Sequence, residues 1–233
     1  MMLRRSEERG RYQNSWLDSY HTFSFGSYYD PEHMQFGPLR VINQDVVAPS
    51  SGFDFHGHKD MEIFTYILSG ELEHQDSMGH KERIRPGEVQ IMSAGTGVLH
   101  SEYNPSAKDS VELLQIWVMP AHFGLAPRYA QKTFSLEEKR NQFRLVISPN
   151  EHAGSLKIFQ EAWVWASVFT KGYQADFELR HGNKAWLHVG RGEIEVNGQR
   201  LGKGDALAIS EKEKLSVAGR SEDAEFLILE FGV

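Results

Sequence analysis

Short segments rich in apolar residues, separated by turns that contain glycine or proline, recur along the whole chain. Segments this short and this regularly spaced are typical of strands in all-β sandwiches and barrels. We therefore expect an all-β protein. In the first half the segments are residues 39–43, 63–68, 71–76, 89–92 and 113–119, and in the second half residues 163–169, 185–189, 193–196, 201–209 and 225–231.

Local signals predict how some of these segments are connected. Ser69-Gly70 separates two of the segments and predicts a hairpin between them, and Asn197-Gly198 is a strong hairpin signal in the second half. Residues 121–141 read as a connection. Within it, Ser135 as N-cap and Glu138 as the partner of a capping box predict a short helix.

The two halves of the sequence resemble each other. Residues 67–73 parallel residues 187–195, and residues 85–91 parallel residues 202–208, in the same order of strand, glycine turn and strand. Such a repeat favours two related β-barrel domains over one large sandwich. We place the boundary in the connection, which gives an N-terminal domain of residues 1–130 and a C-terminal domain of residues 131–233.

Composition and charge narrow the function classes. The chain has 233 residues, 40% of them hydrophobic and 24% charged, as in ordinary soluble globular proteins. A net charge of −7 without a cluster of basic residues argues against direct nucleic-acid binding. Residues 1–8 have no apolar segment of the kind found in signal peptides, and no apolar run approaches the roughly 18 residues of a membrane span, so we expect neither a signal peptide nor a membrane span. We therefore expect a cytoplasmic protein with no membrane partner.

Two short pairs of polar residues suggest a metal site. His56 and His58 are separated by one residue, and so are His100 and Glu102, so that in strands each pair projects from one face. Because the chain has no cysteine, a metal must use imidazole and carboxylate ligands. Three imidazoles and one carboxylate suit iron, copper, nickel, manganese or zinc, and suit calcium poorly. One such pair alone is commonly a chance occurrence, and it is the second pair that favours a metal site.

Other residues compete for these roles. Glu62 has the same strand parity as His58, and it would reach the same ion only with a bend at Lys59-Asp60. Its alternative role is to orient a ligand imidazole. The remaining histidines show no such pairing, and we interpret them as solvated or hydrogen-bonded structural residues. They are His21, His33, His74, His80, His122, His152, His181 and His188.

Several longer segments carry a family resemblance. They are residues 16–25, 39–43, 55–62, 74–79, 90–102 and 114–117. In these segments, and over nearly its whole length, the chain resembles the pirin-like members of the cupin superfamily. The resemblance implies a bicupin, in which two cupin-type, jelly-roll-like β-barrels are packed side by side. It also implies one mononuclear metal in the N-terminal barrel and a metal-free C-terminal barrel.

The resemblance also assigns the ligands. The pirin-like ligand positions correspond to His56, His58, His100 and Glu102, whereas the general cupin pattern takes its carboxylate from the position of Glu62. The chain departs from the family at residue 57, where glycine replaces the usual proline and loosens the backbone. We expect metal binding to survive with less preorganisation. Iron is the expected divalent ion, with copper, nickel, manganese, cobalt and zinc as alternatives.

The activity implied by the resemblance is that of a quercetin 2,3-dioxygenase. The substrates are then a flavonol, or a related aromatic compound, and dioxygen, which opens the heterocyclic ring and releases carbon monoxide and a depside. Glu102 is the expected catalytic residue, because a carboxylate beside the metal can accept the proton of the flavonol 3-hydroxyl. Phe53, Met92, Gln115 and Trp117 are either pocket or core residues.

Two other functions remain open from the sequence. Some pirin-like proteins are regulators, which implies a redox-sensing protein whose metal controls binding to a protein partner. The acidic net charge would then favour a basic protein. The third hypothesis is a cupin that binds a small molecule or carbohydrate and carries a structural metal.

Overall fold

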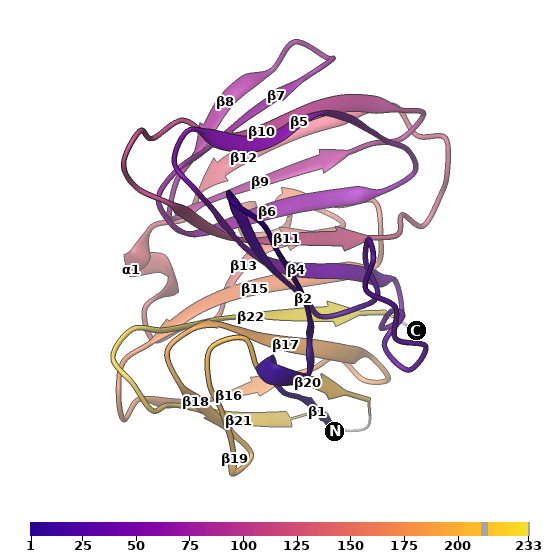
Figure 1. Ribbon diagram of the computed structural model, residues 1–233. Coiled ribbons are helices and arrows are strands. Elements are labelled where there is room, and N and C mark those ends of the chain that lie inside the picture. The colour runs from indigo at the N-terminus through magenta and orange to yellow at the C-terminus, as the bar shows by residue number, and fades with distance from the viewer. Residues whose placement is uncertain (211–213, 233) are drawn as a thin grey trace. The chain divides into compact units, whose positions relative to one another are not determined.

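The structure, a computed structural model, describes residues 1–210 and 214–232 and is built almost entirely of β-strands (Figure 1). Within these residues, the helical elements are α1 (Leu136–Lys139) and the single 3-10 turns η1 (Ser6–Glu8) and η2 (His152–Gly154). The chain forms two compact units. The N-terminal unit comprises residues 10–133 and 158–160, and the C-terminal unit comprises residues 1–9, 134–157 and the chain from Glu161 onward.

The N-terminal unit contains two antiparallel sheets. The seven strands of the larger sheet are, in spatial order, β12 (Arg128–Thr133), β9 (Glu88–Ser93), β6 (Glu62–Ser69), β11 (Val111–Val118), β4 (Leu39–Val47), β3 (Leu17–His21) and β2 (Gly10–Gln13). The four strands of the smaller sheet are β5 (Ser51–His58), β10 (Val98–Asn104), β7 (Leu72–Asp76) and β8 (Lys81–Ile84).

The C-terminal unit likewise contains a seven-stranded and a four-stranded sheet. Its larger sheet has the order β1 (Met2–Arg4), β20 (Ala206–Ile209), β17 (Lys184–Arg191), β22 (Ala224–Phe231), β15 (Ala162–Phe169), β13 (Arg144–Ser148) and β14 (Leu156–Lys157). Its smaller sheet has the order β16 (Gln174–Glu178), β21 (Lys214–Gly219), β18 (Ile194–Val196) and β19 (Gln199–Leu201). In the two larger sheets, β6, β11 and β4 occupy the same places as β17, β22 and β15. This correspondence confirms the internal repeat and the jelly-roll-like cupin fold. The two sheets of a unit do not join into a continuous hydrogen-bonded barrel among the described strands.

The expected hairpin at Ser69-Gly70 is wrong. β6 pairs with β9 and β11, whereas β7 pairs with β8 and β10, so the chain passes at Gly70 from one sheet to the other. The corner requires glycine, because φ is +78° and a Cβ atom would lie 2.7 Å from the carbonyl oxygen of Ser110. The C-terminal unit turns the same corner at Gly192, where φ is +71°.

Two other local predictions are confirmed. β18 and β19 form a hairpin, in which Asn197 and Gly198 both have positive φ, as a type I′ turn requires. At α1, the Ser135 side chain accepts a hydrogen bond from the Glu138 N–H, and the Glu138 carboxylate accepts one from the Ser135 N–H.

A row of buried polar residues crosses the larger sheet of the N-terminal unit between two apolar clusters. Along β6, Thr65 lies between Ile63 of one cluster and Ile67 of the other. The cross-strand neighbours that form the row are His21, Asn43, Gln115, Thr65 and Gln90. In the C-terminal unit the strand positions of Thr65 and Gln115 are occupied by Leu187 and Ile228, which are also cross-strand partners. The two units therefore differ in the chemistry of this layer.

Candidate metal centre

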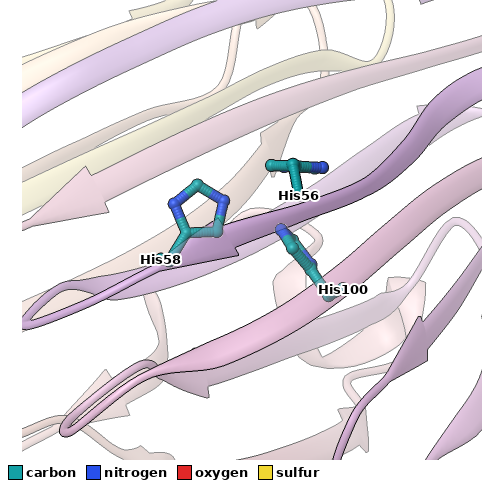
Figure 2. A group of neighbouring side chains, drawn as sticks. All are labelled: His56, His58 and His100. Carbon is teal, nitrogen blue, oxygen red and sulfur yellow. The ribbon is translucent and has the colours of Figure 1, made fainter.

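Three imidazoles meet on the smaller sheet of the N-terminal unit. His56 and His58 project from β5, and His100 on β10 is the cross-strand partner of His56. The centroids of the three rings are 4.5 to 4.8 Å apart, and one ring nitrogen of each lies within 4.8 Å of the others. Figure 2 shows the three rings gathered over these two adjacent strands.

A β-bulge in β5 shapes this cluster. His56 pairs with His100 and Phe53 pairs with Glu102, so Asp54 and Phe55 together oppose a single residue of β10. The extra residue lets Phe53 and His56 both line the cavity, although simple alternation would place them on opposite faces. The carbonyl oxygen of Asp54 also lies 2.8 Å from Nδ1 of His56, which must therefore carry the hydrogen. This arrangement leaves the Nε2 lone pair of His56 available to a metal.

The other two imidazoles have the properties of metal ligands. The Nε2 atoms of His58 and His100 are buried and form no hydrogen bond with any described residue. Burial and the neighbouring imidazoles lower the pKa of His58 to about 4 and that of His100 to about 3. Both rings are therefore neutral at neutral pH, as a metal ligand must be. A buried lone pair without a donor is costly, and a metal ion would satisfy it.

Glu102 lies beside this cluster and lines the same cavity. Its carboxylate accepts hydrogen bonds from Nε2 of Gln115, and Oγ1 of Thr65 lies 3.4 Å from its Oε1. Among the described residues, the groups that could hold a metal are His56 with His58 and His100, and Glu102 with His74 and His100. His100 thus links the three-histidine cluster to the carboxylate.

Glu62 has its own partners elsewhere in the unit. Its carboxylate accepts hydrogen bonds from Oγ of Ser93 at 3.0 Å and from the backbone N–H of Phe159 at 3.2 Å. Burial raises the pKa of Glu62. Glu62 belongs to neither metal-capable group of the described residues. These contacts favour Glu102 over Glu62 as the carboxylate of the site.

His74, which we interpreted from the sequence as a structural residue, lies directly against the cluster. Its Nδ1 is 3.4 Å from Nδ1 of His100, and its Nε2 is 3.3 Å from Oδ2 of Asp76. The sequence did contain a signal for this residue. His74 and Asp76 are separated by one residue in a strand, as His100 and Glu102 are, so both project from one face.

A cavity of about 500 Å³ lies over His56, His58 and Glu102. This volume is in the usual range for small-molecule sites. Of the four expected pocket residues, Phe53, Gln115 and Trp117 line the cavity, whereas Met92 belongs to an apolar core cluster. The other lining residues are Tyr12, Leu17, Ser19, His21, Phe25, Gly26, Ser27, Asn43 and Asp45.

The cavity has an aromatic side and a polar side. The ring of Trp117 lies edge-on to His58 at 4.8 Å and to Phe25 at 5.4 Å, between centroids. On the polar side, the hydroxyl of Ser19 donates a hydrogen bond to the carboxylate of Asp45, and Asn43 lies nearby in the same lining. The cavity therefore suits an aromatic molecule that carries hydroxyl groups.

Comparisons with known proteins agree with this geometry. Residues 3–118 match the family model described as Pirin, and residues 145–231 match the model of the quercetinase C-terminal cupin domain. Over 228 residues, the chain is 45% identical to a quercetin 2,3-dioxygenase of Escherichia coli (strain K12), covering 98% of this chain and 97% of the relative. The chain belongs to the pirin family. A pirin-like protein of Caulobacter vibrioides is 37% identical over 225 residues, which is 96% of each chain.

A solved structure of a bacterial pirin has the same fold as this pirin-family chain. The E. coli pirin YhhW in complex with nickel(II) superimposes with a TM-score of 0.93 at 44% identity, and the match covers 99% of this chain and 98% of the other. Both metal-capable groups of described residues lie in the N-terminal unit, which is also where the Pirin model matches. Within the described ranges, no helix has the length and apolar character needed to cross a membrane.

Proposed function

We propose that this protein is a metal-dependent dioxygenase that cleaves a flavonol such as quercetin, with the metal held by His56, His58, His100 and Glu102. The observation that carries the proposal is the meeting of three imidazoles, two of them with buried and unsatisfied Nε2 atoms, beside an aromatic cavity. The 45% identity to the E. coli quercetin 2,3-dioxygenase supports the choice of substrate.

A divalent transition metal held by these four residues would supply a positive charge that lowers the pKa of a nearby flavonol 3-hydroxyl, so that this hydroxyl would ionise near neutral pH. We propose iron as the ion. The nickel(II) complex of YhhW supports the proposal that a site of this kind binds a divalent metal. The ligand set also accommodates copper, manganese, cobalt and zinc.

The residues around the metal have three separate roles: accepting a proton, positioning the carboxylate and packing against the substrate. Glu102 accepts the proton of the substrate hydroxyl, and the amide of Gln115 holds the carboxylate in place by hydrogen bonds. Phe53 and Trp117 pack against the flavonol rings and exclude water from them. In the overall reaction, one dioxygen adds to one flavonol, the heterocyclic ring opens, and carbon monoxide and a depside leave.

The test is quercetin turnover by protein of known metal content. Purified protein should be analysed for metals, stripped with a chelator and reconstituted with one divalent ion at a time. We expect quercetin bleaching, oxygen uptake and carbon monoxide release in equal amounts, all lost on chelation. His58→Ala and His100→Ala should lose both metal and activity, whereas His122→Ala, a change at an exposed position, should retain both. Bleaching by the metal-free protein, or bleaching without carbon monoxide, would contradict the proposal.

A further inference from the structure

A row of hydrogen-bonded side chains leads from His100 to the surface of the smaller sheet. Nδ1 of His100 faces Nδ1 of His74 at 3.4 Å, and Nε2 of His74 faces Oδ2 of Asp76 at 3.3 Å. Oδ2 of Asp76 then lies 2.9 Å from Nδ1 of His80. The side chains of His74 and Asp76 are fully buried, whereas that of His80 is 39% exposed.

The hydrogen positions along this row follow from Asp76. Its carboxylate also accepts hydrogen bonds from the backbone N–H groups of Met78 and His80, at 2.9 and 3.1 Å. A carboxylate with several such donors stays ionised and is an acceptor only. The hydrogen in its contact with His74 therefore belongs to Nε2 of His74, so that Nδ1 of His74 can serve as the acceptor in its contact with His100.

The hydrogen position on His100 depends in turn on His74. Because Nδ1 of His74 accepts, Nδ1 of His100 must donate, and its Nε2 is then the nitrogen with a free lone pair. That Nε2 is the buried atom without a hydrogen-bond partner among the described residues. A metal ion between His74 and His100 would instead take the two Nδ1 atoms and leave this buried Nε2 unsatisfied. The geometry thus favours His74 as a neighbour of the ligand rather than a ligand.

Tyr129 keeps the row from rearranging. Its ring stacks on His74 at 4.8 Å and 30° and on His80 at 4.7 Å and 21°. The Tyr129 hydroxyl donates to Oε1 of Gln131 at 2.7 Å, which fixes the tyrosine itself. Rotation of either imidazole out of its plane would break this stacking, which opposes an exchange of the positions of its two nitrogens.

We propose that His74 and Asp76 are positioning residues that hold His100 in the tautomer with a hydrogen on Nδ1, so that Nε2 is presented to the metal. The inference rests on the proposed function in taking the histidine cluster as the metal centre. Residues that orient a metal-ligating histidine in this way are typically responsible for a 10- to 100-fold difference in metal affinity.

The tautomers can be observed directly in the metal-free protein. In protein with ¹⁵N-labelled histidine, long-range ¹H–¹⁵N correlations should show the hydrogen on Nδ1 of His100 and on Nε2 of His74. His74→Phe retains a ring to stack on Tyr129 but removes the acceptor. We expect His100 in this variant to populate both tautomers, and nickel affinity, measured by competition with a chelator, to fall about 10- to 100-fold.

Three further variants make the test specific. His74→Asn places an amide oxygen near the former Nδ1 and should restore most of the affinity. Asp76→Asn weakens the acceptor, should release both tautomers, and tests the same row if His74→Phe does not fold. Glu82→Gln removes a charge at the exposed cross-strand partner of His74 and should change neither readout.

The outcomes separate this inference from the proposed function. If His100 keeps its hydrogen on Nδ1 in folded His74→Phe and Asp76→Asn, with nickel affinity within about twofold of wild type, the positioning role is overturned. A hydrogen on Nε2 of His100 in the wild type would overturn it as well. If the wild type binds no metal, the proposed function fails, while the tautomers of the metal-free protein still decide on the row.

Discussion

The side-chain amide nitrogen of Gln115 lies 2.8 Å and 2.6 Å from the two carboxylate oxygens of Glu102, and both side chains are buried. Thr65 Oγ1 donates to the amide oxygen of Gln115 at 3.1 Å, which turns the nitrogen toward the carboxylate. The buried polar row of the larger sheet therefore helps to fix the position of the Glu102 carboxylate through this amide.

Replacing this amide should cost stability. Gln115→Met keeps the length of the side chain and removes the donor, so the buried carboxylate loses its strongest partner. We expect the free energy of unfolding of the metal-free protein to fall by about 1–3 kcal/mol in urea denaturation. Gln75→Met, at an exposed position of β7, is the matched control and should stay within about 0.5 kcal/mol of wild type.

The two carboxylates near the site should differ in function. Glu102→Gln should lower kcat for quercetin about 100-fold or more, because the amide cannot accept the substrate proton. Glu62→Gln should retain turnover and metal content, because Glu62 is engaged by Ser93 and Phe159. Steady-state kinetics with metal analysis of both variants makes the comparison. If Glu102→Gln turned over quercetin as fast as wild type, Glu102 would not be the proton acceptor.

Gly57, between two of the proposed ligands, should tolerate a side chain. A Cβ atom there would meet Cδ2 of Leu99 at 3.3 Å, and Leu99 is 53% exposed and can turn aside. Gly57→Ala should therefore raise the free energy of unfolding by about 0.4–1 kcal/mol, by restricting the unfolded chain, and should tighten nickel binding. Gly79→Ala is the opposite control, because φ is +98° there and alanine would be strained. A loss of stability in Gly57→Ala would show that the strand needs glycine.

His188 should make the stability of the protein depend on pH. It is completely buried, and neither ring nitrogen hydrogen-bonds to a described residue. Burial, with a further contribution from Arg9, holds its pKa well below 6.5. Below pH 6.5 the unfolded chain therefore binds a proton that the folded chain does not, and stability falls as pH decreases, by up to about 1.4 kcal/mol per pH unit.

The variant that checks this is His188→Leu. Urea denaturation at pH 7, 6 and 5 should show a smaller loss of stability for His188→Leu than for wild type. His122→Gln, which changes an exposed histidine, should keep the wild-type slope. Equal slopes for His188→Leu and wild type would mean that His188 binds its proton equally well in the folded and unfolded states.

Features set by a few neighbouring residues could be predicted from the sequence. The capping box of Ser135 and Glu138 and the hairpin at Asn197-Gly198 depend on residues within a few positions of each other. The corner at Gly70 depends instead on which sheet β7 joins, and its partner β10 lies far along the chain. Alternation of polar and apolar residues looks the same in either sheet, so the hairpin prediction failed.

In the candidate site, too, features set by neighbouring residues could be predicted, whereas features set by the pairing of distant strands could not. Strand parity predicted that His56 and His58 share a face, since this follows from period-two alternation. The register that pairs His56 with His100, and the bulge at Asp54 and Phe55, depend on contacts between separate strands. His74 was interpreted as structural because its contact with His100 exists only once β7 and β10 are paired.

The pairing of β1 with β20, which sets Met2 beside Ala208, has a consequence for biosynthesis (Figure 1). Residues 2–4 leave the ribosome long before their partner strand exists. At a synthesis rate of about 5–20 residues per second, tens of seconds pass before β20 has been made, and residues 10–133 can already fold in this time. The C-terminal sheet is therefore completed late, when residues 2–4, which are synthesised early, pair with β20. An affinity tag fused ahead of Met2 would lie at the edge of that sheet.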